Sequence, residues 1–259
     1  MCNKINITPK LTIEGEDRTL GAVLLGAPYS RKRESVMLPM IQQDIQSKPM
    51  MGVAVFDTDG IPTQAAARCA RESGRPYVLL DPRMEWCPFF NPLIGDENEV
   101  FEDLRTVVSE YLPDLSPSLR ALNESLLSNA IKVLKRLDKA EGVNGRYATF
   151  INMNTVLQNP SQDGRKLVIR FGQLKGETDA EQKENSDIAS WFINEYYAER
   201  SKPFEQTACL RLLLGKLISE PHLRTVLNPD FDKGQVSEVD FDRLVSDNCI
   251  ISVSYTHLT

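Results

Sequence analysis

The sequence predicts an α/β fold built on a parallel sheet. Short apolar runs that end in turns alternate with helical segments in the first third of the chain. The runs expected to be strands are Leu20–Leu25, Met51–Phe56 and Pro76–Leu80. Strands that alternate with helices over short links are parallel and joined by right-handed crossovers. Because the runs are continuously apolar, we expect helices to cover both faces of the sheet.

Two helices are expected between these strands. The first spans Glu34–Gln46, where apolar side chains recur at helical spacing on one face. The second spans Thr63–Arg71, with Thr63 as a candidate cap and with small side chains that suit close packing against a sheet. Gly74 is expected to end the second helix.

The pattern changes after Asn91-Pro92, where amphipathic helical stretches replace the apolar runs. The stretches expected to be helices are Glu97–Tyr111, Pro117–Lys139, Ala189–Ala198 and Glu205–Ser219. Gly142–Gly145 and Asn159–Gly164 are expected to be loops. This part of the chain is therefore predicted to be a mostly helical subdomain.

Three segments follow from these patterns. Residues 1–95 form the first part of the sheet domain, residues 96–227 an all-helical insertion domain, and residues 228–259 the return to the sheet domain. The apolar run Cys249–Ser252 is expected to begin another core strand. The final residues, Ser252–Thr259, resemble translated sequencing-adapter read-through, which predicts that the sheet domain is truncated there.

Composition and charge argue against several classes of protein. The net charge of −6 disfavours a surface given over wholly to nucleic acid. Five scattered cysteines form no CxxC pair and only two histidines are present, so we predict no disulfide scaffold, no metal site and no histidine-based catalytic centre. The sequence has neither an uninterrupted apolar run of about 18 residues nor a signal peptide, which predicts a soluble cytoplasmic chain without a membrane segment.

A candidate phosphate loop lies between the first expected strand and the first expected helix. Functional loops follow G-x-x-x-x-G-K-[ST]: backbone N–H groups surround the phosphates, the lysine binds their oxygens and the hydroxyl holds Mg²⁺. Here Gly26 and Lys32 have the required separation, but Arg31 replaces the second glycine and Arg33 replaces the hydroxyl residue. A side chain at Arg31 is expected to forbid positive φ and to crowd the phosphate. Taken alone, the segment could equally be a basic loop that caps a helix. The candidate nucleotide-binding residues are Gly26, Ala27, Pro28, Tyr29, Ser30, Arg31, Lys32 and Arg33.

Three landmarks in order resemble the TraG-type coupling protein family of type IV secretion and conjugative DNA transfer. The stretch Gly26–Ile41 resembles that family's G-[AP]-x-G-S-G-K-T loop (its Walker A motif) and the following helix, which begins E-S-V and soon has a proline. Asp57–Gly60 resembles its "DPKGD" segment. Asp81-Pro82 and Cys87–Leu93 resemble its "fDP … fNPL" signature. The resemblance is good over residues 19–95 and looser over the helical region.

The resemblance implies a P-loop NTPase of the RecA-like type, with ATP and Mg²⁺ as cofactors. Members of the family form homohexamers at the cytoplasmic side of the bacterial inner membrane, where they connect relaxase-bound single-stranded DNA to secretion-channel proteins. Lys32 corresponds to the lysine that binds phosphates, whereas Tyr29, Arg31 and Arg33 depart from the motif. These departures predict impaired nucleotide binding. No catalytic residue is predicted within the chain, because the family's acidic Walker B pair and arginine finger lie further downstream.

Other residues have two interpretations each. Asp57 and Asp59 follow an expected strand at the sheet edge where ligands bind, and they are candidate nucleotide-binding residues; turn formation and helix capping explain them as well. The cations Lys132, Lys135, Arg136 and Lys139 could contact DNA phosphates or simply favour a helix C-terminus. Aromatic residues could stack on bases or fill the core; they are Trp86, Trp191, Tyr196 and Tyr197.

The sequence leaves three functions open. The first is an ATP-binding DNA-transfer motor domain, of which this chain is a fragment with an impaired loop. The second is a catalytically inactive interaction module with the same fold. The third, a small-molecule kinase with a phosphate loop, is disfavoured because it requires neither the helical insertion nor the "fNPL" landmark.

Overall fold

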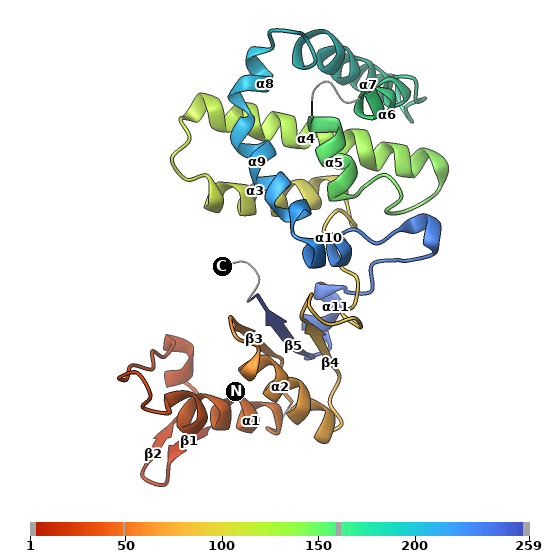
Figure 1. The fold of residues 1–259 in the computed structure, drawn as a ribbon. Coiled ribbons are helices and arrows are strands. Elements are labelled where there is room, and N and C mark those ends of the chain that lie inside the picture. The colour runs from red at the N-terminus through yellow and green to blue at the C-terminus, as the bar shows by residue number, and fades with distance from the viewer. Residues whose placement is uncertain (1–3, 49, 159–161, 256–259) are drawn as a thin grey trace. The chain divides into compact units, whose positions relative to one another are not determined.

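The computed structural model describes residues 4–48, 50–158 and 162–255, which form two compact units (Figure 1). The sheet unit comprises residues up to Pro88 together with those from Val239 onward, and the helical unit comprises Phe89–Glu238. The segment boundaries expected after residues 95 and 227 fall inside the helical unit. A helical region is thus inserted between the two parts of a sheet-containing unit.

The sheet unit is an α/β structure with a three-stranded parallel sheet, as the sequence predicts. The strands are β3 (Val53–Asp57), β4 (Tyr77–Leu80) and β5 (Ile250–Ser254), in the order β3-β5-β4. Ile250 lies opposite Val53 on one side and Tyr77 on the other. The central strand therefore comes from the far end of the sequence, and it confirms the strand predicted at Cys249–Ser252.

Two helices cover one face of this sheet. They are α1 (Leu38–Ile45), which continues directly from a π-helical segment, η2 (Arg33–Met37), and α2 (Ile61–Glu72), which follows β3. Their side chains bury a small apolar cluster against the sheet; its members are Ile45, Val55, Ala66, Cys69, Ala70 and Ile250. The alanines of α2 let the helix approach the strands closely, as expected from their small size.

The opposite face is open at β3, so the expectation that helices cover both faces is wrong there. Alternate residues of a strand point to opposite faces. Val55 and Asp57 are buried, whereas Ala54 and Phe56 are exposed, Phe56 to 62%. A continuously apolar strand therefore places one row of side chains on this exposed surface.

The strand predicted at Leu20–Leu25 is also wrong. Leu20 ends a short 3-10 helix, η1 (Asp17–Leu20), and residues 21–25 have no regular secondary structure. Leu20, Val23 and Leu25 are each more than 80% exposed, at 83%, 84% and 87%. Among the described residues, the run pairs with neither of the outer strands, β3 and β4, although each of them has a free edge. Apolar composition shows that a segment can be buried, but it does not determine whether the segment pairs with another strand.

The N-terminal part of the sheet unit contains a hairpin that the sequence analysis did not predict. Its strands are β1 (Ile5–Thr8) and β2 (Leu11–Ile13), which pair antiparallel. The amide side chain of Gln43 in α1 donates to the Asn6 carbonyl at 2.9 Å and accepts from the Asn6 N–H at 3.0 Å. One side chain thus attaches the hairpin to the helix.

The helical unit is built around one long helix. Its helices are α3 (Glu97–Tyr111), α4 (Pro117–Glu141), α5 (Phe150–Leu157), α6 (Gln162–Gly172), α7 (Asp179–Trp191), η3 (Phe192–Tyr196), α8 (Lys202–Gln206), α9 (Ala208–Ser219) and α10 (Pro221–Leu227). Ser116 caps the start of α4, and Gly142 ends it with a positive φ of 65°. Leu126, Ile131 and Leu134 lie on its buried face, at the spacing that the sequence predicts.

Some of the predicted helices of this unit are confirmed, and others differ from the observed ones in their boundaries. Glu97–Tyr111 and the start of the long helix are confirmed. The helix expected at Glu205–Ser219 is divided at Thr207 into α8 and α9. The loop expected at Asn159–Gly164 is helical from Gln162, and residues 159–161 lie outside the described part of the chain.

The remaining helix of the sheet unit, α11 (Phe241–Ser246), immediately precedes β5. Within the described ranges, no helix combines the length and apolar character needed to cross a bilayer.

Candidate functional site

The candidate phosphate loop is closed by its own lysine. The Lys32 ammonium donates to the carbonyl oxygens of Gly26, at 2.9 Å, and Ala27, at 3.3 Å. A turn inside the loop is fixed by the Ser30 N–H, which donates to the Ala27 carbonyl at 3.2 Å. A Cβ atom on Gly26 would lie 2.8 Å from the Ser30 hydroxyl oxygen, so the glycine permits this close return of the chain.

Two residues of the loop adopt left-handed backbone. Tyr29 has a φ of 64° and Arg31 a φ of 53°. These are the two positions where the TraG-type motif has glycine after its first residue. A side chain in this region costs roughly 1–2 kcal/mol per residue. The expectation that the Arg31 side chain forbids positive φ is therefore wrong, and the loop keeps a glycine-like path at an energetic cost.

The loop ends beside the carboxyl end of β3. Arg33, the first residue of η2, forms an ion pair with Asp59, with its guanidinium nitrogen 2.6 Å from the carboxylate oxygen. Both side chains are partly exposed, to 38% and 37%. This pair brings together two candidates that lie far apart in the sequence. Ligands of open parallel sheets bind at this edge.

Asp57 is held by backbone donors. Its carboxylate accepts hydrogen bonds from the N–H of Asp59 at 2.9 Å, from that of Gly60, and from that of Thr63 at 2.7 Å. Gly60, with a φ of 81°, precedes the first residue of α2. The cap of α2 is therefore supplied by Asp57, not by the side chain of Thr63 as the sequence suggested. Turn formation and helix capping, one of the two interpretations of Asp57 from the sequence, therefore account for these contacts.

Asp59 has both of its oxygens engaged as well. One accepts from the Ile61 N–H at 3.1 Å, and the other pairs with Arg33. The two aspartates thus organise the start of α2 and its connection to the loop. Their role toward a nucleotide stays a prediction.

A second ion pair lies at the same sheet edge, and the sequence analysis missed it. Asp81 follows β4 and is only 1% exposed. Arg83 binds it through two nitrogens, at 2.8 and 2.5 Å, and reaches the Ser254 hydroxyl at the end of β5 at 3.4 Å. The hydrogen bond to Asp81 raises the pKa of the Arg83 guanidinium. An arginine two residues after a strand-ending aspartate is the signal that could have identified this pair.

The residues present do not fit a magnesium ion. Magnesium requires about six oxygen ligands in octahedral geometry. Arg33 contributes no oxygen at the hydroxyl position, and its guanidinium already pairs with Asp59. Among residues 4–48, 50–158 and 162–255, no group of three or more acidic, cysteine or histidine side chains is placed to hold a metal.

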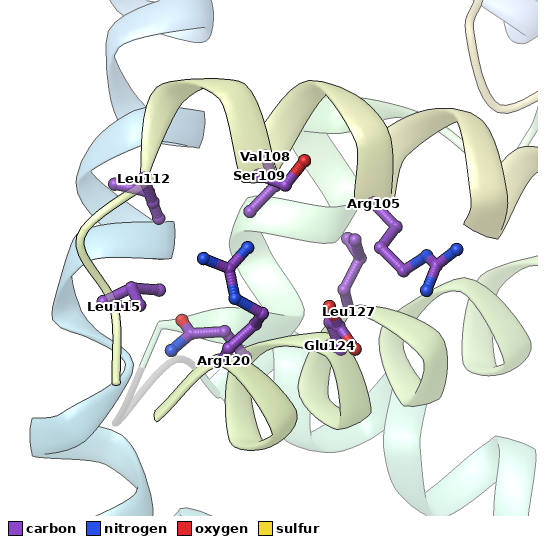
Figure 2. A pocket seen from close by; sticks show the side chains of 9 residues that line it. Arg105, Val108, Ser109, Leu112, Leu115, Arg120, Glu124 and Leu127 are labelled. Carbon is purple, nitrogen blue, oxygen red and sulfur yellow. The ribbon is translucent and has the colours of Figure 1, made fainter. Parts of the chain in front are cut away.

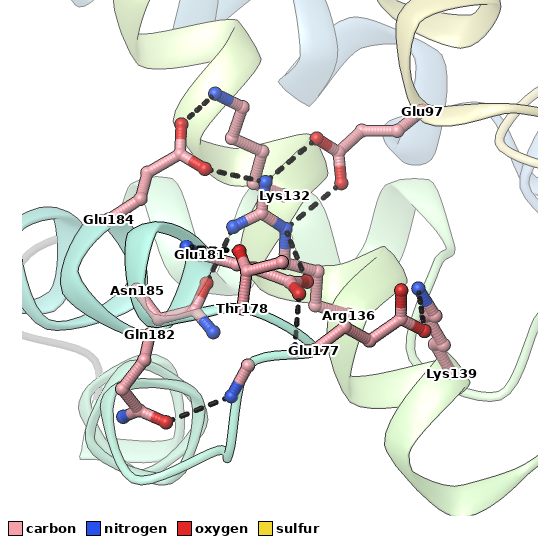
Figure 3. Close-up of polar contacts among 11 residues, drawn as sticks. Glu97, Lys132, Arg136, Lys139, Glu177, Thr178, Glu181, Gln182, Glu184 and Asn185 are labelled. Carbon is pink, nitrogen blue, oxygen red and sulfur yellow. Dashed lines mark hydrogen bonds and ion pairs between the residues drawn. The ribbon is translucent and has the colours of Figure 1, made fainter.

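The four candidate cations on α4 each contact a partner within the protein, and Figure 3 shows three of them, Lys132, Arg136 and Lys139. Lys132 pairs with Glu184 at 2.6 Å and Lys139 with Glu177 at 2.8 Å. Lys135 donates to the Leu93 carbonyl at 3.0 Å. These contacts compete with any binding to DNA phosphates, so the structure gives no support to the DNA-binding interpretation of these residues.

Arg136 lies at the centre of this charge cluster and is only 12% exposed. It contacts Glu97 of α3 at 3.1 Å, and Glu184 and Asn185 of α7 at 2.8 and 2.6 Å (Figure 3). One guanidinium therefore connects three helices. A buried ion pair with fixed geometry and several partners can favour one arrangement of the helices that it joins.

The candidate aromatic residues of the helical unit belong mainly to its core. Tyr196 and Tyr197 are 0% and 3% exposed, and their hydroxyls donate to the carbonyls of Leu157 and Val156. Burial raises the pKa of both phenols. Trp191 stacks on Tyr196 with a centroid distance of 5.4 Å. Only Trp86 of the four candidates is largely exposed, at 59%.

A small cavity lies between α3 and α4 (Figure 2). Arg105, Arg120 and Leu127 are among its lining residues, and so is Asn123, whose side-chain amide oxygen Oδ1 is buried without a protein partner. The cavity volume is about 10 Å³, which is enough for roughly one water molecule. The cavity is therefore too small for an organic ligand.

The sheet edge gathers three consecutive cations, Arg31, Lys32 and Arg33. Lys32 is held by the loop carbonyls and Arg33 by Asp59. This chain matches no family model and no curated protein.

Proposed function

We propose that this chain is part of the ATP-binding motor domain of a TraG-type coupling protein for conjugative DNA transfer or type IV secretion, with impaired nucleotide binding. The observation that carries the proposal is the closure of the loop by Lys32 onto Gly26, next to the carboxyl end of β3. The left-handed backbone at Tyr29 and Arg31 supports it, because the related motif has glycine at both positions.

In this proposal the fold is that of a P-loop NTPase of the RecA-like type. The parallel sheet and the helices on one of its faces are compatible with that fold. The helical unit would correspond to the family's inserted all-α domain. The exposed run at Leu20–Leu25 departs from it, since the family has a buried strand before its loop.

The loop would hold a polyphosphate through its N–H groups and Lys32. The Lys32 ammonium would exchange the carbonyls of Gly26 and Ala27 for phosphate oxygens, which are stronger acceptors. The side chains of Tyr29 and Arg31 occupy positions where the family has none. Each charged hydrogen bond that they prevent removes roughly 1.5–3 kcal/mol of binding free energy.

The family's other properties are part of the same proposal. They are a homohexamer at the cytoplasmic side of the inner membrane, single-stranded DNA delivered by a relaxase, and secretion-channel proteins as partners. The cations of α4 are not assigned to DNA here, because Glu97, Glu177 and Glu184 already pair with three of them.

A catalytically inactive interaction module with the same fold is the second candidate. The observation that favours it is the exposure of Leu20, Val23, Leu25 and Phe56 in the sheet unit. These side chains would bind another protein if they form one contiguous apolar patch.

Restoration of the loop tests the proposal. The triple variant Tyr29→Gly, Arg31→Gly, Arg33→Thr should bind ATP with Mg²⁺ in calorimetric titration, whereas the unmodified chain should bind weakly or not at all. Arg33→Thr alone should not suffice, because Arg31 still occupies the loop. Adding Lys32→Ala to the triple variant should abolish binding again. A folded triple variant that binds no ATP would show that the loop is not a phosphate loop.

A further inference from the structure

The loop between α4 and α5 is organised by one buried carboxylate. Asp138, in the last turn of α4, is only 4% exposed. Its two oxygens accept the N–H groups of Gly145 at 2.8 Å, Tyr147 at 2.7 Å and Ala148 at 3.2 Å. A side chain of the preceding helix thus holds three main-chain donors of the loop.

The same loop carries the Asn-Gly pair of this sequence, Asn144-Gly145. Such a pair is chemically unstable, because glycine has no side chain that would hinder attack of its nitrogen on the neighbouring amide. Asn144 is exposed to water, whereas Gly145 is buried and has a φ of 84°. A Cβ atom at Gly145 would lie 3.1 Å from the Ile94 side chain. Backbone and packing therefore both favour glycine after Asn144.

We propose that Asn144 is a deamidation site that the folded helical unit keeps unreactive through the contact between Asp138 and Gly145. In the reaction, the Gly145 nitrogen loses its proton to solvent and attacks the side-chain carbonyl carbon of Asn144. A C–N bond forms, the side-chain amide bond breaks, and the departing nitrogen takes a proton from solvent and leaves as ammonia. Water then opens the resulting succinimide at either carbonyl, which gives aspartate or isoaspartate at position 144.

The contact with Asp138 opposes the first step. The Gly145 nitrogen must leave its hydrogen bond to the buried carboxylate before it can react. Tyr147 and Ala148 donate to the same carboxylate, and the Asn152 amide of α5 donates to the Tyr147 carbonyl at 3.0 Å. Both flanking helices therefore fix the loop backbone. The reaction has to wait for local opening of the loop, as amide hydrogen exchange does.

Deamidation would change the loop permanently. An isoaspartate at position 144 adds one atom to the main chain, which displaces the Gly145 N–H from Asp138. Either product also adds a negative charge a few residues from Asp138 and Glu141, and like charges repel. Opening of the loop would thus leave a lasting chemical record in the helical unit. The proposal is independent of the nucleotide-binding function, because it concerns residues of the helical unit alone.

Ageing of the full chain in mildly alkaline buffer, with and without guanidinium chloride, tests the proposal. Peptide mapping by mass spectrometry measures the conversion of amide to carboxyl at Asn144. The unfolded chain should react about tenfold faster or more, since release of an N–H from a charged acceptor has a cost of that order. Equal rates overturn the proposal. A faster reaction in the folded chain overturns it too, because Asp138 would then act as the base that removes the Gly145 proton.

Hydrogen exchange provides a second measurement on the unmodified folded chain. Folding should slow exchange of the Gly145 amide by about the same factor as deamidation of Asn144, because one opening permits both reactions. A Gly145 amide that exchanges as freely in the folded chain as in the unfolded chain overturns the proposal.

Two substitutions test the role of Asp138. Asp138→Asn removes the charge and leaves one oxygen acceptor, so the folded variant should deamidate at Asn144 about tenfold faster. Asp232→Asn is the matched control, because it removes a carboxylate that contacts the same loop only through the Arg146 side chain, at 3.2 Å. It should leave the rate unchanged.

Circular dichroism verifies that each variant is folded. A folded Asp138→Asn variant that reacts no faster than the control overturns the proposal. If Asp138→Asn does not fold, the comparison of exchange with deamidation in the unmodified chain decides.

Discussion

The carboxylate of Asp57, the last residue of β3, accepts the N–H of Thr63 in the first turn of α2 at 2.7 Å. The strand thus caps the helix that follows it. With the N–H groups of Asp59 and Gly60, three backbone donors that would otherwise lack partners are satisfied by one side chain.

We predict that Asp57→Ala destabilises the protein by roughly 1–3 kcal/mol, because buried N–H groups lose a charged acceptor. Urea unfolding followed by circular dichroism measures this change. Asp59→Ala is the matched control, since its ion pair is partly exposed and should cost less than about 1 kcal/mol. Equal losses in the two variants would contradict the capping role of Asp57.

Tyr29→Gly should leave stability unchanged or raise it by up to about 1 kcal/mol, because relief of left-handed strain offsets the greater freedom of glycine in the unfolded chain. Ser30→Gly is the control, since Ser30 is not among the residues with positive φ. It should destabilise by roughly 0.5–1 kcal/mol. If both glycines destabilise the protein equally, Tyr29 is not strained.

Arg136→Met should destabilise the helical unit by roughly 3–5 kcal/mol, because it leaves the carboxylates of Glu97 and Glu184 without their shared cation. Lys139→Met provides the comparison, since Lys139 is 60% exposed and its pair with Glu177 should contribute less than about 1 kcal/mol. Chemical unfolding of both variants decides the matter. Similar effects would mean that burial of Arg136 is not what makes its pairing important.

Stability should fall in acid partly through Glu184. The hydrogen bond from Lys132, together with Arg136, lowers the pKa of Glu184 below its ordinary value of 4.5. A lowered folded-state pKa contributes stability that is present above 4.5 and is lost as the pH falls through the folded value. Glu184→Gln should therefore show a shallower loss of unfolding free energy below pH 4.5 than the unmodified chain. Parallel slopes would contradict this assignment.

The loop-repaired triple variant should bind ATP without hydrolysing it. Hydrolysis requires an acidic side chain that holds the metal and positions water. In the described part of the chain, Asp57 is occupied by backbone N–H groups and no metal-holding acidic cluster occurs. Phosphate release over a concentration series, with sedimentation in parallel, measures this. Turnover that rises with a discrete oligomer would show that the chain carries catalytic groups not identified here.

Much of the secondary structure could be predicted from the sequence, because apolar periodicity reports burial. β3, β4, α3 and α4 were predicted within a few residues for this reason. The structure of Leu20–Leu25 was predicted wrongly. Its apolar content is that of a buried strand, but whether a segment pairs with the sheet depends on the whole fold and not on local composition. The β1–β2 hairpin was missed because its strands are short, and its contact with Gln43 links distant segments.

The candidate site divides in the same way. Local spacing identified Gly26 and Lys32, which contact each other in the structure. The contact between Arg33 and Asp59 could not be predicted, because it depends on where β3 ends relative to the loop. The same holds for Arg83 and Ser254, which are joined only when β5 lies next to β4.

The position of β5 between β3 and β4 has a consequence for synthesis on the ribosome. Residues 250–254 pair with strands that are made long before them, so the sheet cannot close until the ribosome has passed residue 254. Meanwhile the helical unit, continuous from Phe89 to Glu238, has all of its residues available and can fold first. Until β5 is made, nascent β3 and β4 keep unpaired hydrogen-bonding edges. During this interval, chaperone binding or misassociation should have its greatest influence on the yield of folded protein.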